Sequence, residues 1–287
     1  MTLTQFLTGI LLMLLWAGRP IVYKPVAQYF PLKISPAFAS SWLLIGLILT
    51  FPLLGHLLTD NIKEVFLSPY LLLAIYKGVT LFYLLELQQV INKDSTSSMA
   101  FLNFIALALG ALTNNLFFHE GLGTIKVICI LGFGLLGLIF LKRGDAQRLS
   151  FKQKLAFIAV ALLVASYTVS DHLAIPQLGW YPYLLINSVV MFITSLFHGI
   201  SCKDLKNIFK NKAIITAGLV YTISEFFVMY ASIKILPVSI VAVFLRLSVP
   251  LVMVYSALRY HEQSLKNQLT FGLIAIALAL PIILIKS

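Results

Sequence analysis

Residues 124–148 have the sequence TIKVICILGFGLLGLIFLKRGDAQR, in which a long apolar run ends in a basic, polar segment. A helix needs about 20 mostly apolar residues to cross the roughly 30 Å hydrocarbon core of a bilayer. Similar runs recur along the whole chain, which is 60% hydrophobic and 11% charged. A soluble domain has about 45–50% apolar and about 25% charged residues. The sequence therefore predicts an all-α, multi-pass membrane protein.

Ten transmembrane helices are expected from the apolar runs. The first five are expected near Leu3–Tyr29, Pro36–Leu58, Leu67–Val90, Ser95–Phe117 and Thr124–Leu141. After the basic segment Lys142–Arg148, five more are expected near Lys154–Leu173, Tyr181–Ile200, Ala213–Ile233, Val238–Leu258 and Leu265–Ile285.

The two sets of five helices have matching motifs. Phe118-His119-Glu120 follows the fourth run and Tyr260-His261-Glu262 the ninth, and His119 and His261 are 142 residues apart. The same offset relates His56 to His198 and Thr80 to Thr222, and Leu14-Leu15-Trp16-Ala17 is similar to Leu162-Leu163-Val164-Ala165. We therefore expect two repeats, residues 1–148 and 149–287. Because each has an odd number of helices, the second repeat must enter the membrane inverted, as in many secondary transporters.

The chain resembles the drug/metabolite transporter superfamily, in particular its EamA-type ten-helix branch. The similarity rests on Leu14-Leu15-Trp16-Ala17, on the His119-Glu120 turn before a glycine-containing helix, and on Pro250 followed by Leu-Arg-Tyr-His-Glu262. The chain departs from the family where Ser41 and Trp42 replace a frequent arginine, and where Ala108 takes the first-repeat position of Pro250. The resemblance implies a single-chain carrier, often an exporter of amino acids or other metabolites, with a central cavity between the halves.

Charged residues inside the ninth and eighth runs are the first candidates for a site. A charge at the bilayer centre costs at least about 2.5–3.5 kcal/mol, so it calls for a reason. Arg246 lies deep in the ninth run, and Glu225, one turn after Tyr221, is its expected partner. Glu225 could instead bind a substrate ammonium or transfer a proton, and the alternative for both residues is a structural ion pair.

The first run contains Arg19 next to Pro20. Because proline frees a backbone carbonyl, a local helix break could line a cavity there with Arg19. The alternative is that Arg19 extends toward the nearer interface, which is also the expectation for Lys24.

In the third run, Tyr76, Thr80 and Tyr83 fall on one helical face, with Glu86 to one side. Lys77 and Glu86 are on opposite faces, since successive residues differ by about 100°. We expect Glu86 to face the interior and Lys77 to extend to the interface.

Further polar candidates lie in the fourth and sixth runs. Asn103 is either a substrate ligand or a contact between helices. Tyr167 and Asp171 form a polar end to the sixth run. The residues Trp180, Tyr181 and Tyr183 are interpreted as an interfacial aromatic belt.

The intramembrane charges favour a secondary transporter for a small zwitterionic or amphoteric metabolite, such as an amino acid or derivative, in the cytoplasmic (inner) membrane. A coupling proton or an exchanged metabolite would be a second partner, and the protein would be a monomer or homodimer. Alternatives are an efflux carrier for lipophilic cations, and a non-transporting protein or lipid-carrier flippase subunit. No motif indicates an enzyme, a metal site, a cofactor or nucleic-acid binding, although the net charge is +11.

The basic residues concentrate in the connections that follow odd-numbered runs, such as Lys142–Arg148 and the segment from Lys203 to Lys212. By the positive-inside rule, these connections would be cytoplasmic and both termini would lie outside. The family resemblance implies the opposite orientation, so the two expectations conflict.

Overall fold

The computed structural model describes residues 2–29, 34–59, 62–92, 96–118, 123–143, 149–236, 238–261 and 265–284, and within them the chain forms helices and no strand. The long helices are α1 (Leu3–Tyr29), α2 (Ile34–Leu54), α5 (Leu71–Asn92), α6 (Thr96–Phe118), α7 (Thr124–Arg143), α8 (Phe151–Leu178), α9 (Trp180–Phe197), α11 (Lys212–Lys234), α12 (Val238–Tyr260) and α13 (Leu265–Leu284). Short helices are α3 (His56–Thr59), α4 (Ile62–Leu67) and α10 (Cys202–Asn207).

Each expected apolar run coincides with one long helix, and the boundaries differ by a few residues. The largest difference is α8, which begins at Phe151 and continues to Leu178. It begins early because Ser150 and Gln153 form a capping box, in which each side chain bonds the other residue's backbone N–H. It ends at Gly179, whose φ of 78° lies in the region that glycine adopts without strain.

Six of the helices in the described part of the chain are long and apolar enough to cross a membrane: α1, α2, α5, α8, α9 and α11. Shorter apolar stretches occur in α7, α12 and α13. Large apolar side chains such as Ile48, Leu53 and Phe197 are exposed, and an apolar exterior of this kind suits a lipid environment. The architecture is compatible with a multi-pass membrane protein.

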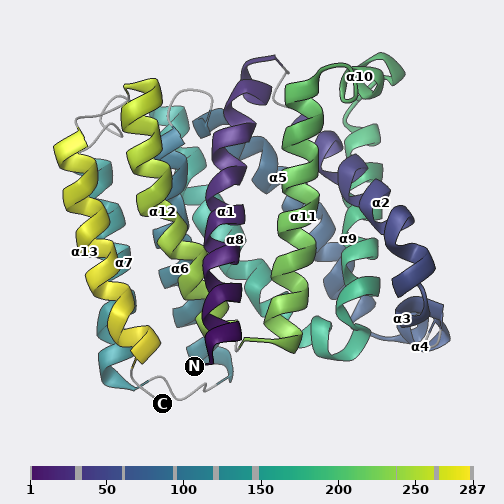
Figure 1. Cartoon of the computed structure of the whole chain (residues 1–287). Coiled ribbons are helices and arrows are strands. Elements are labelled where there is room, and N and C mark those ends of the chain that lie inside the picture. The colour runs from purple at the N-terminus through teal and green to yellow at the C-terminus, as the bar shows by residue number, and fades with distance from the viewer. Residues whose placement is uncertain are drawn as a thin grey trace.

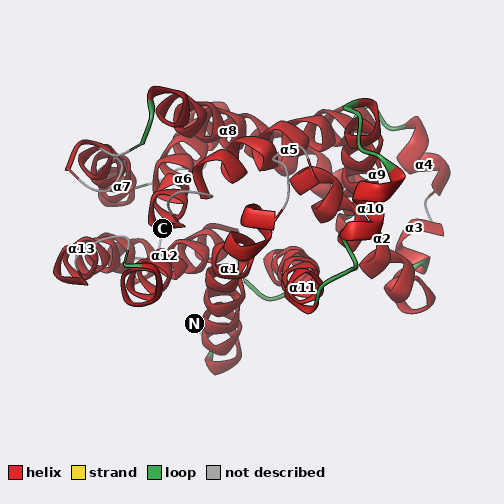
Figure 2. Cartoon of the chain, turned by 90° about the horizontal axis from the view of Figure 1, so that it is seen from above, coloured by secondary structure: helices red, strands yellow, loops and turns green. Residues whose placement is uncertain are grey.

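The long helices form two layers (Figure 2). The α1 layer contains α13, α12, α1, α11 and α2, and the α8 layer contains α7, α6, α8, α5 and α9. Each layer therefore combines helices from both predicted repeats, so the two repeats interleave.

Neighbour relations in one layer have counterparts in the other. In the α1 layer, α1 packs against α11 and α12, α12 against α13, and α11 against α2. In the α8 layer, α8 packs against α5 and α6, α6 against α7, and α5 against α9. Between the layers, α2 contacts α9, α12 contacts α6, and α13 contacts α7. The order of contacts is thus the same in both layers.

Successive long helices run in alternating directions (Figure 1). As a result α1 begins and α13 ends at the same end of the molecule, here called the terminus end, where α3 and α4 also lie. The helix α10 lies at the opposite end. The directions of α1 and α8 are opposite, as two inverted repeats would require.

Close packing between α2 and α11 depends on glycine. A Cβ atom at Gly218 would overlap the indole ring of Trp42. That ring also makes a tilted contact with Phe209, at 5.5 Å between centroids. At Gly18, in contrast, a Cβ would meet Val220 at an ordinary 3.5 Å.

The substitution Gly218→Ala is therefore expected to lower the free energy of unfolding by about 1–3 kcal/mol, the usual cost of overpacking. Gly18→Ala is the matched control, and it should be neutral or slightly stabilising because alanine favours a helix more than glycine does. Thermal unfolding of both variants in detergent would measure the difference. If the two variants have the same midpoint of thermal unfolding, Gly218 and Trp42 are not in close contact.

Candidate functional site

A buried ion pair joins α1 to α11. The Nη1 atom of Arg19 lies 2.7 Å from Oε1 of Glu225, and the two side chains are only 14% and 18% exposed. Both residues lie well inside their helices, away from the ends. The ion pair gives two charges in the interior of the bundle an opposite partner, which such residues require in a membrane protein.

Aromatic rings contact the guanidinium group of Arg19 from two helices. Its Cζ atom lies 4.1 Å from the centroid of the Trp16 ring and 4.3 Å from that of Tyr221. Trp16 is one turn before Arg19 and Tyr221 is one turn before Glu225, so helical spacing places each ring beside its charge. A cation held between aromatic faces is stabilised by their quadrupoles. We call Trp16, Arg19, Tyr221 and Glu225 the central group.

Several buried polar atoms of α1, α2 and α11 lack hydrogen-bond partners within the described residues. They include the hydroxyl of Tyr23, whose ring contacts Phe38 and Tyr221, the indole N–H of Trp42, and the hydroxyl of Thr222. A buried polar group without a partner costs about 1–3 kcal/mol. Most such groups in native proteins bind a protein group or water. The hydroxyl of Tyr23, whose ring contacts Tyr221, could therefore supply a hydrogen bond to water or to a small molecule near the central group.

A second ion pair joins α5 to α8. The Nζ atom of Lys77 lies 2.5 Å from Oδ1 of Asp171, and the same oxygen accepts a 2.6 Å hydrogen bond from the hydroxyl of Tyr183 on α9. Lys77 also lies over the rings of Tyr167 and Tyr183, at 4.8 and 5.2 Å from their centroids. We call Lys77, Tyr167, Asp171 and Tyr183 the lower group.

The expectation for Lys77 was wrong: it is 5% exposed and paired in the interior, and does not extend to the interface. Lys24 likewise is buried, with its Nζ atom 4.1 Å from the centroid of the Tyr260 ring. In both cases a partner on another helix makes burial favourable. The depth of a residue along its own helix does not by itself identify a partner on another helix.

The interpretation of residues 180–183 as an interfacial aromatic belt was also wrong. Trp180, Tyr181 and Tyr183 are 8%, 1% and 0% exposed. The hydroxyl of Tyr181 donates a 2.8 Å hydrogen bond to the carbonyl of Leu47 on α2, and Trp180 contacts Phe226 on α11. These aromatic side chains connect α9 to the α1 layer.

The predicted partner of Glu225 differs from the observed one. Glu225 is paired with Arg19, whereas the side chain of Arg246, in α12, lies outside the described residues. The side chain of Asn103, in α6, also lies outside them. The local break that Pro20 could produce is absent, because α1 is continuous from Leu3 to Tyr29.

The candidates on α5 are placed differently from one another. Thr80 is buried, but Tyr76 and Tyr83 are 44% and 43% exposed. The hydroxyl of Tyr76 donates to Ser166 on α8, at 2.9 Å, and the ring of Tyr83 contacts His198. Glu86, one turn after Tyr83, is half-buried. Thus the structure brings Arg19, Tyr221 and Glu225 together, and Tyr167 and Asp171 together, but Tyr76, Tyr83 and Glu86 belong to neither group.

Of the paired His-Glu turns, His261 is within the described residues, and its φ of 51° is the left-handed conformation that commonly ends a helix. That conformation agrees with a role of His261 in forming the turn after α12. The residues His119, Glu120 and Glu262 lie outside the described part of the chain.

Comparison with known proteins gives no assignment: no protein-family model matches the chain, and no curated protein matches it. Membership of the EamA-type branch stays a prediction from the motifs.

Proposed function

We propose that the chain is a secondary transporter for a small amphoteric metabolite, an amino acid or a derivative of one, in the cytoplasmic membrane. It would cross the membrane with ten helices, as two inverted five-helix repeats, and work by alternating access. The alternating helix directions and the equal order of contacts in the two layers support this architecture. In an inverted repeat, one half moves against the other around a site near the middle of the membrane.

The single observation that supports the substrate class best is the Arg19–Glu225 ion pair with its aromatic contacts. A zwitterion can insert between the two side chains, with its carboxylate on the guanidinium and its ammonium on the carboxylate of Glu225. Each charge keeps an opposite partner during that exchange, so the bound state avoids an unpaired buried charge. Arginine is also the residue best suited to bind a carboxylate with two parallel hydrogen bonds.

The charge balance favours this substrate over a lipophilic cation. A carrier for cations needs a carboxylate that is free to neutralise the substrate. Here Glu225 and Asp171 are each already paired with a basic side chain. A cation alone would have to displace Arg19 or Lys77 and leave that side chain without a partner.

Transport by reconstituted protein tests the proposal. Candidate substrates would be found by thermal-shift screening of amino acids and nucleoside-like metabolites, because a ligand at 100 times its Kd stabilises the folded state by about 2.7 kcal/mol. Uptake of the best ligand into proteoliposomes is then expected to fall at least about tenfold in Arg19→Gln and in Glu225→Gln, since each loses one of the two charges that bind the zwitterion.

The matched control is Arg259→Gln, a change of the same type in the exposed last turn of α12, which should leave uptake unchanged. Size-exclusion chromatography would confirm that each variant is folded before its uptake is measured. Wild-type rates in both Arg19→Gln and Glu225→Gln would mean that the site is assigned wrongly.

A further inference from the structure

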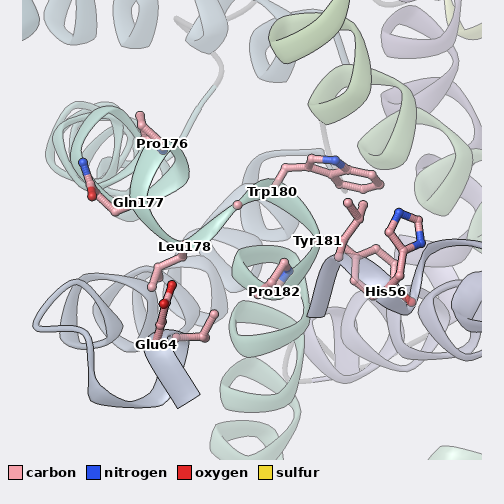
Figure 3. Close-up of a pocket in the computed structure, with 11 residues that line it drawn as sticks. His56, Glu64, Pro176, Gln177, Leu178, Trp180, Tyr181 and Pro182 are labelled. Atoms are coloured by element: carbon pink, nitrogen blue, oxygen red, sulfur yellow. The ribbon is translucent and has the colours of Figure 1, made fainter. Parts of the chain in front are cut away.

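A pocket of about 300 Å³ opens beside the connection between α8 and α9 (Figure 3). Its walls come from three parts of the chain: α3 with His56, α4 with Glu64, and residues 176–182 around the positive-φ Gly179. Because α3 and α4 lie at the terminus end, the pocket does so too (Figure 1).

The lining of the pocket suits an ammonium group. Among the described residues that line it, Glu64 is the only one with a carboxylate, and none is a lysine or an arginine. The aromatic rings of His56, Trp180 and Tyr181 lie on the opposite side from Glu64 (Figure 3). A carboxylate facing aromatic rings attracts cations by charge and by the quadrupoles of the rings.

A layer of apolar side chains separates this pocket from the lower group. Val65 and Leu178 line the pocket, and both pack in one buried cluster with Ala74, Ala174 and Tyr183. Ala74 is three residues before Lys77 on α5, and Ala174 three residues after Asp171 on α8. At 1.5 Å per residue, the apolar layer therefore lies about one turn closer to the terminus end than the ion pair does.

Beyond that layer, the lower group joins three helices. Lys77 and Asp171 join α5 to α8, and the hydroxyl of Tyr183 joins α9 to the same carboxylate. Three helices are thus connected at a single oxygen atom. Separation of α8 or α9 from α5 at this depth would require those contacts to break.

We propose that the pocket is an outer binding site for the ammonium group of the transported molecule, and that Lys77, Asp171 and Tyr183 form the closed gate between it and the central group. This inference rests on the proposed transport function. In the opening step the substrate ammonium takes the place of the Lys77 ammonium on Asp171, and the substrate carboxylate takes the place of Asp171 on Lys77. Both buried charges therefore keep an opposite partner during the exchange.

Chemical modification of engineered cysteines tests the pocket without requiring transport. In a Cys129→Ser/Cys202→Ser background, Gln177→Cys places a thiol at the exposed wall of the pocket. The probes are a trimethylammonium-ethyl and a sulfonato-ethyl methanethiosulfonate, used on protein in detergent micelles. The ratio of the cationic to the anionic modification rate should fall at least about fivefold when Glu64→Gln is added. A unit charge at contact distance in water changes the energy of each probe by about 1 kcal/mol, with opposite signs for the two probes, and half of that change for each probe already gives about fivefold.

A second cysteine tests the gate. Asn187 is one turn after Tyr183 on α9, on the inner side of the gate, and is 1% exposed. Asn187→Cys should be modified at least tenfold faster when Asp171→Asn is added, and the charge-exchanged pair Lys77→Asp/Asp171→Lys should restore slow modification. Tyr183→Phe keeps the Lys77–Asp171 ion pair, so the modification rate of Asn187→Cys should be intermediate in this variant. Because the change is milder, it also tests the gate if Asp171→Asn does not fold. Lys152→Gln, at the exposed first turn of α8, is the control and should change nothing.

An unchanged ratio at Gln177→Cys overturns the outer site, and unchanged modification of Asn187→Cys overturns the gate, whatever the transport assay gives. If both cysteines respond as expected but no substrate is transported, the proposed function fails while the pocket and its gate stand.

Discussion

Replacement of Arg19 by methionine is expected to lower the free energy of unfolding by about 3–5 kcal/mol, the usual cost of removing one partner from a buried ion pair. The physical reason is the carboxylate of Glu225, which is 18% exposed and would remain in the interior without its cation. The lost stacking on Trp16 and Tyr221 adds to the effect, because both rings lie within 4.3 Å of the guanidinium carbon.

The double variant Arg19→Met/Glu225→Leu separates charge from packing. With both charges removed, no buried ion remains unpaired, so most of the lost stability should return. Arg259→Met, on the exposed last turn of α12, should stay within about 0.5 kcal/mol of wild type. Reversible unfolding in mixed micelles gives the four free energies. A cost of less than 0.5 kcal/mol for Arg19→Met would show that Arg19 is solvated at an interface and not paired.

Replacement of Lys77 by methionine should cost about 3 kcal/mol, at the lower end of the range for a broken buried pair. Asp171 would lose its cation but keep the 2.6 Å hydrogen bond from Tyr183, which compensates in part. Tyr183→Phe should cost about 1.5–3 kcal/mol, the contribution of a hydrogen bond to a charged group.

The two substitutions are expected to be non-additive, since Lys77 and Tyr183 bind the same oxygen of Asp171. In Lys77→Met/Asp171→Leu the carboxylate is gone, and stability should recover. The control is Lys152→Met, which removes an exposed lysine of the same chain. Equal unfolding midpoints for Lys77→Met and Lys152→Met would support the original expectation that Lys77 extends to the membrane interface.

Hydropathy predicted the long helices well because each is an apolar run bounded by short polar segments. It did not predict α3, α4 and α10, which are four to six residues long. A helix of one turn or so has no measurable period and is stable only through the packing of its neighbours. The pocket was therefore not predicted, since α3 and α4 form part of its walls.

The charged residues were found by sequence, but their pairing was not. Spacing within a helix places Tyr221 beside Glu225, and this expectation agrees with their common group around Arg19. The spacing of residues within one helix does not show which helices are neighbours. Glu225 was therefore predicted to pair with Arg246, and Lys77 was predicted to extend to the membrane interface. One signal was available for Lys77 and Asp171: both lie about two turns from helix ends that occupy the same end of the molecule. Charges at equal depth on antiparallel helices are candidates for a pair.

The two buried ion pairs have a consequence for how the protein is made. In both, the cation comes from residues 1–143 and the carboxylate from residues 151–284. In the proposed membrane topology, the first five long helices already contain Arg19 and Lys77 while the ribosome is still producing α8, and the counter-charges of both have then not yet entered the bilayer. Asp171 arrives with α8 and Glu225 only with α11, so neutralisation of the nascent bundle proceeds in two steps along the chain. If the two halves were synthesised as separate polypeptides, the first would keep the two buried cations and the second the two buried carboxylates. The attraction between these opposite charges would favour association of the two halves in the membrane.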